Sequence, residues 1–142
     1  MFTITKVFKF EMAHVLDGSY TEACQLIHGH SYKMEVEVMC KNLNEDGMVI
    51  DFKLLKEIVK EEVIDVYDHQ FVISNKRKES GGIPYPNYIT VDYNPTAENM
   101  CKDFFEKIDS KLIKGIGNRI KLESVSLWET ETGKAKYNRS VS

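Results

Sequence analysis

Two stretches of regular alternation constrain the fold of this chain most, because a period of two residues is the pattern of a half-buried strand. Residues 3–14 carry apolar side chains at alternate positions and end on His14. Residues 30–40 repeat this pattern, with Ser, Lys and Glu on the opposite face. We therefore predict two long strands, each with one face toward a core and the other toward water.

The two strands are expected to form an antiparallel pair. In such a pair the end of the first strand lies beside the start of the second, which brings His14 toward His28 and His30. On an extended strand His28 and His30 point to the same side, roughly 6.6 Å apart. Three neutral imidazoles with an open fourth position are typical of a catalytic zinc site, so the sequence predicts a metal centre here.

Cys24 lies in the connection between these strands, residues 15–27, which is longer than the ~2–5 residues of an ordinary hairpin loop. Two roles fit this position. As a fourth zinc ligand, Cys24 would close a structural site without catalytic function. As a free thiol beside zinc and imidazoles, it would have a pKa below ~8.5 and would act as a base or nucleophile.

Two further positions carry candidate functional groups. Asp68 and His69 follow the first predicted helix, where His69 is either functional or an exposed residue at the helix end. Glu129 keeps the parity of the buried run before it, so its carboxylate would point inward and need a partner. The alternative for Glu129 is a strand end that already lies at the surface.

The remaining pattern predicts an α+β fold in a single domain, residues 1–142, with a four-stranded antiparallel sheet and two helices on one face. Asp51 and Asn94 are the expected N-caps of the two helices, with Pro95 at the first helical position of the second. The expected helices cover roughly residues 52–66 and 95–112. The later strands are expected at residues 88–92 and 119–130, with a short final strand near 135–137. Residues 74–88 are expected to form a loop.

Charge and composition exclude several function classes. The net charge is −3, so no basic excess favours nucleic acid or an acidic membrane surface as partner. The N-terminus alternates, and no apolar run approaches ~18 residues, which argues against a signal peptide or a membrane span. Three cysteines without paired spacing favour a reducing compartment, so we expect a soluble cytoplasmic protein.

Six short motifs occur in one order between residues 8 and 130. The motifs are Phe10–His14, Cys24 with His28-Gly29-His30, Val49–Phe52, Asp68-His69, Pro95–Asn99 and Trp128–Thr130. Together they resemble the 6-pyruvoyltetrahydropterin synthase superfamily. The resemblance implies the tunnelling fold, in which trimers close their sheets into a barrel and two trimers stack as a homo-hexamer.

The resemblance also implies roles for individual residues. Zn²⁺ would be held by His14, His28 and His30. Cys24 would be the base that removes a proton from the substrate. Asp68 and His69 would form a proton relay, which a neighbouring subunit can supply. Glu129 would anchor the guanidine-like edge of the pterin and take part in the relay, and Thr96 would contact the pterin.

The three residues between Cys24 and His28 resemble the 6-carboxytetrahydropterin synthases of queuosine biosynthesis. The implied reaction converts 7,8-dihydroneopterin triphosphate to 6-carboxytetrahydropterin, acetaldehyde and triphosphate. Two alternatives stay open. One is a pyruvoyl enzyme, which eliminates triphosphate without cleaving the side chain. The other is a non-catalytic zinc protein with a His₃Cys site.

Overall fold

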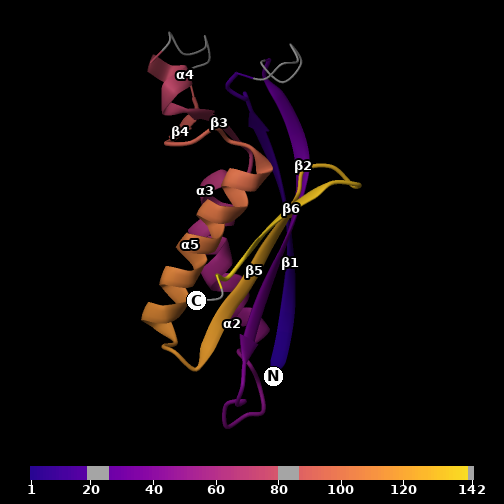
Figure 1. Cartoon of the computed structure of the whole chain (residues 1–142), viewed down its shortest axis with the longest axis vertical. Coiled ribbons are helices and arrows are strands. Elements are labelled where there is room, and N and C mark those ends of the chain that lie inside the picture. The colour runs from indigo at the N-terminus through magenta and orange to yellow at the C-terminus, as the bar shows by residue number, and fades with distance from the viewer. Residues whose placement is uncertain (19–25, 80–86, 141–142) are drawn as a thin grey trace.

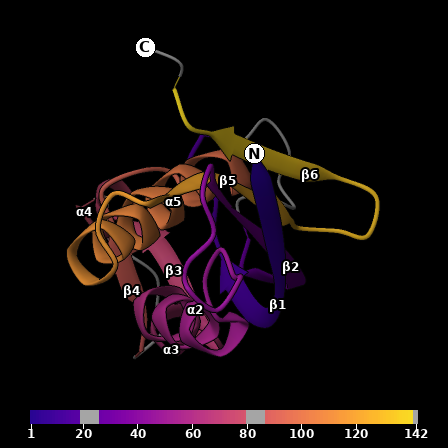
Figure 2. The same ribbon diagram turned by 90° about the horizontal axis from the view of Figure 1, so that it is seen from below.

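A computed structural model of the 142-residue chain describes residues 1–18, 26–79 and 87–140. Its centre is a six-stranded sheet with the order β4-β3-β1-β2-β5-β6. Helices cover one face of this sheet, and the described residues leave the other face uncovered (Figures 1 and 2). The strands are β1 (Phe2–His14), β2 (His28–Cys40), β3 (Gln70–Ser74), β4 (Ile89–Val91), β5 (Ile120–Trp128) and β6 (Lys134–Asn138).

The predicted long hairpin is confirmed. Strands β1 and β2 have 13 residues each and pair antiparallel along their whole length, from Phe2 opposite Cys40 to His14 opposite His28. Side chains alternate between buried and accessible positions along β2, with Met34, Val36 and Val38 fully buried on the helix side. The hairpin therefore carries the end of β1 to the start of β2 at the end of the molecule away from the N-terminus (Figure 1).

The first predicted helix is continuous from residue 52 to residue 67, with one π-helical turn inside it. It comprises α2 (Phe52–Val59), η1 (Lys60–Ile64) and α3 (Asp65–Tyr67). The Asp51 side chain accepts a hydrogen bond from the Lys53 amide at 2.7 Å, so Asp51 is the N-cap, as predicted.

The second helix, α5 (Ala97–Gly115), begins later than predicted. Its N-cap is Thr96, whose hydroxyl accepts from the Asn99 amide at 3.2 Å. The predicted Asn94 cap with Pro95 at the first helical position is therefore wrong. The Asn94 side-chain oxygen instead accepts from the Asp17 amide at 2.8 Å, which ties the start of α5 to the chain after β1.

The α+β class is confirmed, but the sheet is larger than the predicted four antiparallel strands. Strand β3 pairs in parallel with β1, and β4 pairs in parallel with β3. Four of the five β3 residues are buried, so this short strand has no apolar–polar alternation that could predict it. Another difference is α4 (Asn75–Glu79), a short helix within the predicted 74–88 loop.

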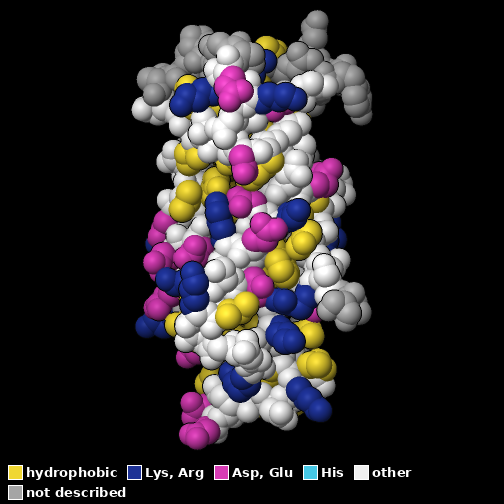
Figure 3. Space-filling view, turned by 60° about the vertical axis from the view of Figure 1, so that its left-hand side comes forward, with side chains coloured by type: hydrophobic (Ala, Val, Ile, Leu, Met, Phe, Trp, Pro, Cys, Tyr) yellow, Lys and Arg dark blue, Asp and Glu magenta, His cyan; other side chains and the backbone are white. Residues whose placement is uncertain are grey.

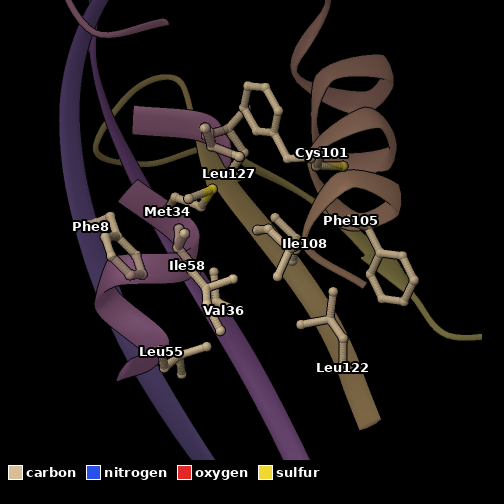
Figure 4. Close-up of a cluster of buried hydrophobic side chains, with 14 of the residues drawn as sticks. Phe8, Met34, Val36, Leu55, Ile58, Cys101, Phe105, Ile108, Leu122 and Leu127 are labelled. Carbon is tan, nitrogen blue, oxygen red and sulfur yellow. The ribbon is translucent and has the colours of Figure 1, made fainter. Parts of the chain in front are cut away.

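The core lies between the helices and the covered face of the sheet (Figure 4). Cys40 and Cys101 are both buried in it. Side chains that meet there include Phe8, Met34 and Val36 from the hairpin, Leu55 and Ile58 from α2, Phe105 and Ile108 from α5, and Leu122 and Leu127 from β5.

Acidic and basic side chains are interspersed on the surface drawn in Figure 3. In the part of the chain that the structure describes, no helix combines the length and the apolar content needed to cross a membrane.

Candidate metal centre

The end of the β1–β2 hairpin brings three histidines together. His14 and His28 are cross-strand partners, and His30 lies two residues further along β2 on the same face. Their ring centroids are 4.4 Å apart for His14 and His28, 5.1 Å for His28 and His30, and 5.2 Å for His14 and His30. One nitrogen of each ring lies within 4.8 Å of the other two, so the group could hold a metal ion.

Backbone carbonyls orient two of the rings. His14 Nδ1 donates to the Pro95 carbonyl oxygen at 2.8 Å, and His28 Nδ1 donates to the Leu26 carbonyl oxygen at 2.8 Å. Because a carbonyl oxygen only accepts, we assign the proton of each neutral ring to Nδ1. The lone pair is then on Nε2, and a carbonyl partner of this kind is what orients many metal-binding histidines.

The surroundings favour the neutral form of His14 and His30. The pKa of His14 is lowered to about 4; burial is the largest cause, the Pro95 carbonyl opposes the shift, and the neighbouring His28 and His30 add to it. Burial also lowers the pKa of His30, with Glu129 opposing the shift and His28 adding to it. Neutral imidazoles are the form that binds metal.

Two ring nitrogens of this group have unmet bonding capacity. Within the described ranges, the buried Nε2 atoms of His14 and His30 have no hydrogen-bond partner. A buried polar atom without a partner is costly, and a cation at this point would satisfy both lone pairs. Three neutral imidazole donors suit Zn²⁺, so the residues present fit the implied metal.

Glu129, the residue after β5, faces this cluster. Its Oε1 atom lies 3.3 Å from His14 Nε2 and 3.6 Å from His30 Nε2. Of the two alternatives for this carboxylate, the inward-facing one is observed. The side chain is 31% exposed, so one side of the cluster stays open to solvent.

Tyr32 also belongs to this site, and the sequence pattern missed it. Its hydroxyl lies 3.5 Å from Glu129 Oε1 and 3.4 Å from His14 Nδ1. Burial and the nearby Glu129 carboxylate raise the pKa of Tyr32, so the hydroxyl keeps its proton and can donate. The only signal in the sequence is a hydroxyl within an apolar row, two residues after His30, since a buried phenol needs a partner.

Asp68 and His69 form a pair at the start of β3. His69 Nδ1 lies 2.9 Å from Asp68 Oδ1, which also accepts from the Glu11 amide at 2.9 Å. The His69 backbone has φ of 61°, a left-handed conformation, and its amide donates to the Glu11 carbonyl oxygen. The imidazole is 76% exposed.

This pair is not bonded to the three histidines. His69 lines an open pocket of about 780 Å³ together with Glu11, Ala13, Gly29 and Ser31, which belong to the uncovered face of the hairpin, and His30 also contributes to the lining of this pocket. His14, His28 and His30 point to the opposite face. Among the described residues, no hydrogen bond or ion pair connects the Asp68–His69 pair to the histidine cluster.

Residues 3–140 match the sequence profile of a family described as 6-pyruvoyl tetrahydropterin synthase. The chain belongs to the 6-pyruvoyl tetrahydropterin synthase family. This match confirms the resemblance inferred from the motifs. A relative from Haemophilus influenzae, named 6-carboxy-5,6,7,8-tetrahydropterin synthase, is 34% identical over 96% of this chain and 99% of its own length.

Solved structures of this fold agree with the family assignment. The Caenorhabditis elegans 6-pyruvoyl tetrahydropterin synthase has a TM-score of 0.71 at 24% identity, covering 98% of this chain and 96% of its own. An uncharacterized protein from Wolinella succinogenes has a TM-score of 0.80 at 22% identity, covering 98% of both chains. These neighbours support the tunnelling fold, the fold of this family.

Two predicted site residues remain, Thr96 and Cys24, and only Thr96 lies in the described part of the chain. Thr96 lies next to Pro95, whose carbonyl orients His14, so the segment that carries Thr96 adjoins the cluster. Its hydroxyl accepts from the Asn99 amide as the cap of α5. Cys24 lies outside the described residues, which resume at Leu26. The roles predicted for Cys24 and Thr96 therefore stay predictions.

Proposed function

We propose that this chain is a zinc-dependent 6-carboxy-5,6,7,8-tetrahydropterin synthase. The reaction converts 7,8-dihydroneopterin triphosphate and water to 6-carboxytetrahydropterin, acetaldehyde and triphosphate, as a step of queuosine biosynthesis. The observation that carries the proposal is the cluster of His14, His28 and His30, with buried ring nitrogens facing Glu129. The name of the Haemophilus influenzae relative supports the choice of product.

His14, His28 and His30 would hold the zinc ion. When bound, Zn²⁺ supplies Lewis-acid chemistry, which makes C–H protons beside a polarised oxygen easier to remove. The Pro95 and Leu26 carbonyls keep two of the rings in the tautomer that presents Nε2. The Glu129 carboxylate accepts from the two N–H groups of the pterin's guanidine-like edge, which fixes the ring plane, and Thr96 contacts the pterin.

Cys24 is the base in this proposal. A thiol near a bound cation and imidazoles has a lowered pKa, so a useful fraction is thiolate at neutral pH and can take a proton from carbon. Its place in the loop that leads into His28 supports this role. If Cys24 were instead a fourth zinc ligand, the site would be closed and non-catalytic.

Asp68 and His69 relay protons to later intermediates. The Asp68 carboxylate accepts from His69 Nδ1, which leaves His69 Nε2 free to exchange a proton. Because this pair lies on the other face of its own hairpin from the histidine cluster, we propose that it serves the site of a second copy. This arrangement would fit the homo-hexamer of two stacked trimers that the resemblance implies.

Product analysis after incubation with dihydroneopterin triphosphate tests the proposal. We expect acetaldehyde and 6-carboxytetrahydropterin in equal amounts. A pyruvoyl product without acetaldehyde would favour the alternative activity, which the name of the Caenorhabditis elegans neighbour suggests.

The Cys24→Ala variant tests the role of the thiol. We expect it to abolish turnover while zinc stays bound. A loss of zinc in this variant would instead favour the non-catalytic protein with a His₃Cys site.

A further inference from the structure

Glu129 lies close to two ring nitrogens of the histidine cluster. Its Oε1 atom is 3.3 Å from His14 Nε2 and 3.6 Å from His30 Nε2. The Tyr32 hydroxyl lies 3.5 Å from the same oxygen. The carboxylate oxygen is thus held against two histidines.

Hydrogen bonds do not explain these two contacts. His14 Nδ1 donates to the Pro95 carbonyl, so neutral His14 presents only a lone pair at Nε2. The 3.6 Å separation between His30 Nε2 and Glu129 Oε1 is too long for a hydrogen bond. The carboxylate oxygen therefore faces a buried lone pair on His14 and a buried His30 nitrogen that has no hydrogen-bond partner among the described residues, an arrangement that a cation between them would stabilise.

The distances from Glu129 Oε1 to two of the three histidines match those between ligands of one metal ion. In a tetrahedral zinc site with bonds of about 2.0–2.2 Å, neighbouring ligand atoms lie about 3.3–3.6 Å apart. The two contacts of Glu129 Oε1, at 3.3 and 3.6 Å, fall in this range. One nitrogen from each histidine lies within 4.8 Å of the others, and Oε1 lies beside two of these rings, where a fourth donor could bind the same ion.

We propose that Glu129 is the fourth metal ligand of the substrate-free protein. This inference rests on the proposed function, in which the same carboxylate binds the guanidine-like edge of the pterin. Glu129 then leaves the metal when the pterin ring arrives. The carboxylate closes the site in the absence of substrate and opens a coordination position only when a pterin is present.

Cobalt substitution tests this directly, because the visible spectrum of Co²⁺ reports the number and type of its ligands. We expect Glu129→Gln to change the spectrum of the substrate-free cobalt protein and to weaken Zn²⁺ binding at least about tenfold. The matched control is Glu131→Gln, the same change at an exposed position two residues later, which should alter neither.

A pterin that lacks the side chain distinguishes the release of Glu129 from coordination of the metal by the substrate's side chain. It has no side-chain oxygen to offer the metal, so a spectral change cannot come from coordination of the substrate's side chain. We expect it to shift the spectrum of the native cobalt protein toward that of substrate-free Glu129→Gln. If Glu129→Gln does not fold, this titration of the native protein decides alone.

Two outcomes overturn the inference at different levels. If the protein binds neither Co²⁺ nor Zn²⁺, the metal centre and the proposed function fail together. If the protein binds zinc and forms acetaldehyde, but neither Glu129→Gln nor the bare pterin changes the spectrum, only the fourth-ligand inference fails.

Discussion

His14 has no exposed surface, so its protonation is tied to folding. Burial lowers its pKa from 6.5 to about 4. Between these pH values the unfolded chain binds more protons than the folded one, so the free energy of unfolding falls as the pH falls. For the chelator-treated protein, we expect a loss of about 3 kcal/mol from His14 between about pH 6.5 and about pH 4, with no further loss below.

Urea unfolding at a series of pH values measures this slope. The His14→Asn variant, which has no titrating ring, should show a flatter dependence over the same window. An unchanged slope in the variant would show that His14 is not the source.

Tyr32 offers a second test at the residue scale. Its hydroxyl faces Glu129 and His14 at 3.5 and 3.4 Å, which are long contacts, so Tyr32→Phe should cost little stability. If the hydroxyl holds the carboxylate that anchors the pterin, we expect KM to rise about two- to tenfold, the equivalent of one hydrogen bond. Tyr137→Phe, on β6, is the matched control and should leave KM unchanged.

Steady-state kinetics on dihydroneopterin triphosphate measure both variants. An equal rise in KM for both tyrosine variants would remove the special role of Tyr32.

The start of α5 is tied to two other segments through Asp103. Asp103 Oδ2 accepts from the Tyr93 hydroxyl at 2.7 Å and from the Tyr67 hydroxyl at 3.4 Å, and it lies 3.1 Å from Lys107 Nζ. Tyr67 directly precedes Asp68, and Tyr93 directly precedes Asn94. This network therefore connects α5 with the segment that carries Asp68 and His69 and with the segment that carries Pro95 and Thr96.

We expect Asp103→Asn to lower the free energy of unfolding by about 1–3 kcal/mol, because the neutral amide weakens a partly buried, charge-assisted network. Urea unfolding of the variant measures this loss. Glu106→Gln, at an exposed position on the same helix, should change stability much less. Equal losses in the two variants would contradict a special role for Asp103.

The elements differ in how well the sequence predicts them. The hairpin is predictable because each strand buries one face, and its antiparallel pairing alone brings His14 to His28. Strand β3 cannot be predicted from the pattern, because it is short and mostly buried and therefore shows no alternation. Its position depends on pairing with the end of β1, a contact between distant parts of the chain that local patterns do not encode.

The same division applies within the site. The three histidines follow from strand parity and pairing. The roles of the Pro95 carbonyl and the Tyr32 hydroxyl could not be predicted in this way. Both groups contact His14 only in the folded chain, and Pro95 is 81 residues away from it in the sequence. The N-cap at Thr96 was missed because Asn94 is an equally good capping residue in isolation, and its tertiary contact with Asp17 decided between them.

For the whole molecule, the separation of Asp68 and His69 from the histidine cluster gives a test of assembly. If these residues serve a second copy, two inactive variants should complement each other. Co-expression of Cys24→Ala with His69→Ala should restore activity in about a quarter of the sites, because random mixing must place an intact cysteine beside an intact histidine. Each variant alone should be inactive.

Differently tagged chains allow the mixed assembly to be purified before its activity is measured. A mixed assembly without activity would show that each site uses its own Asp68 and His69.

Strand β1 pairs with β3 only at residues 12–14, so within the described chain the first ten of its 13 residues have a strand partner on one side only. The free amides and carbonyls of such an edge can pair with any other exposed strand. A newly made chain would thus face a competition between correct assembly and aggregation, and its outcome would depend on how quickly sister chains meet. Recovery of active protein should then depend on the rate of synthesis as well as on the stability of each chain.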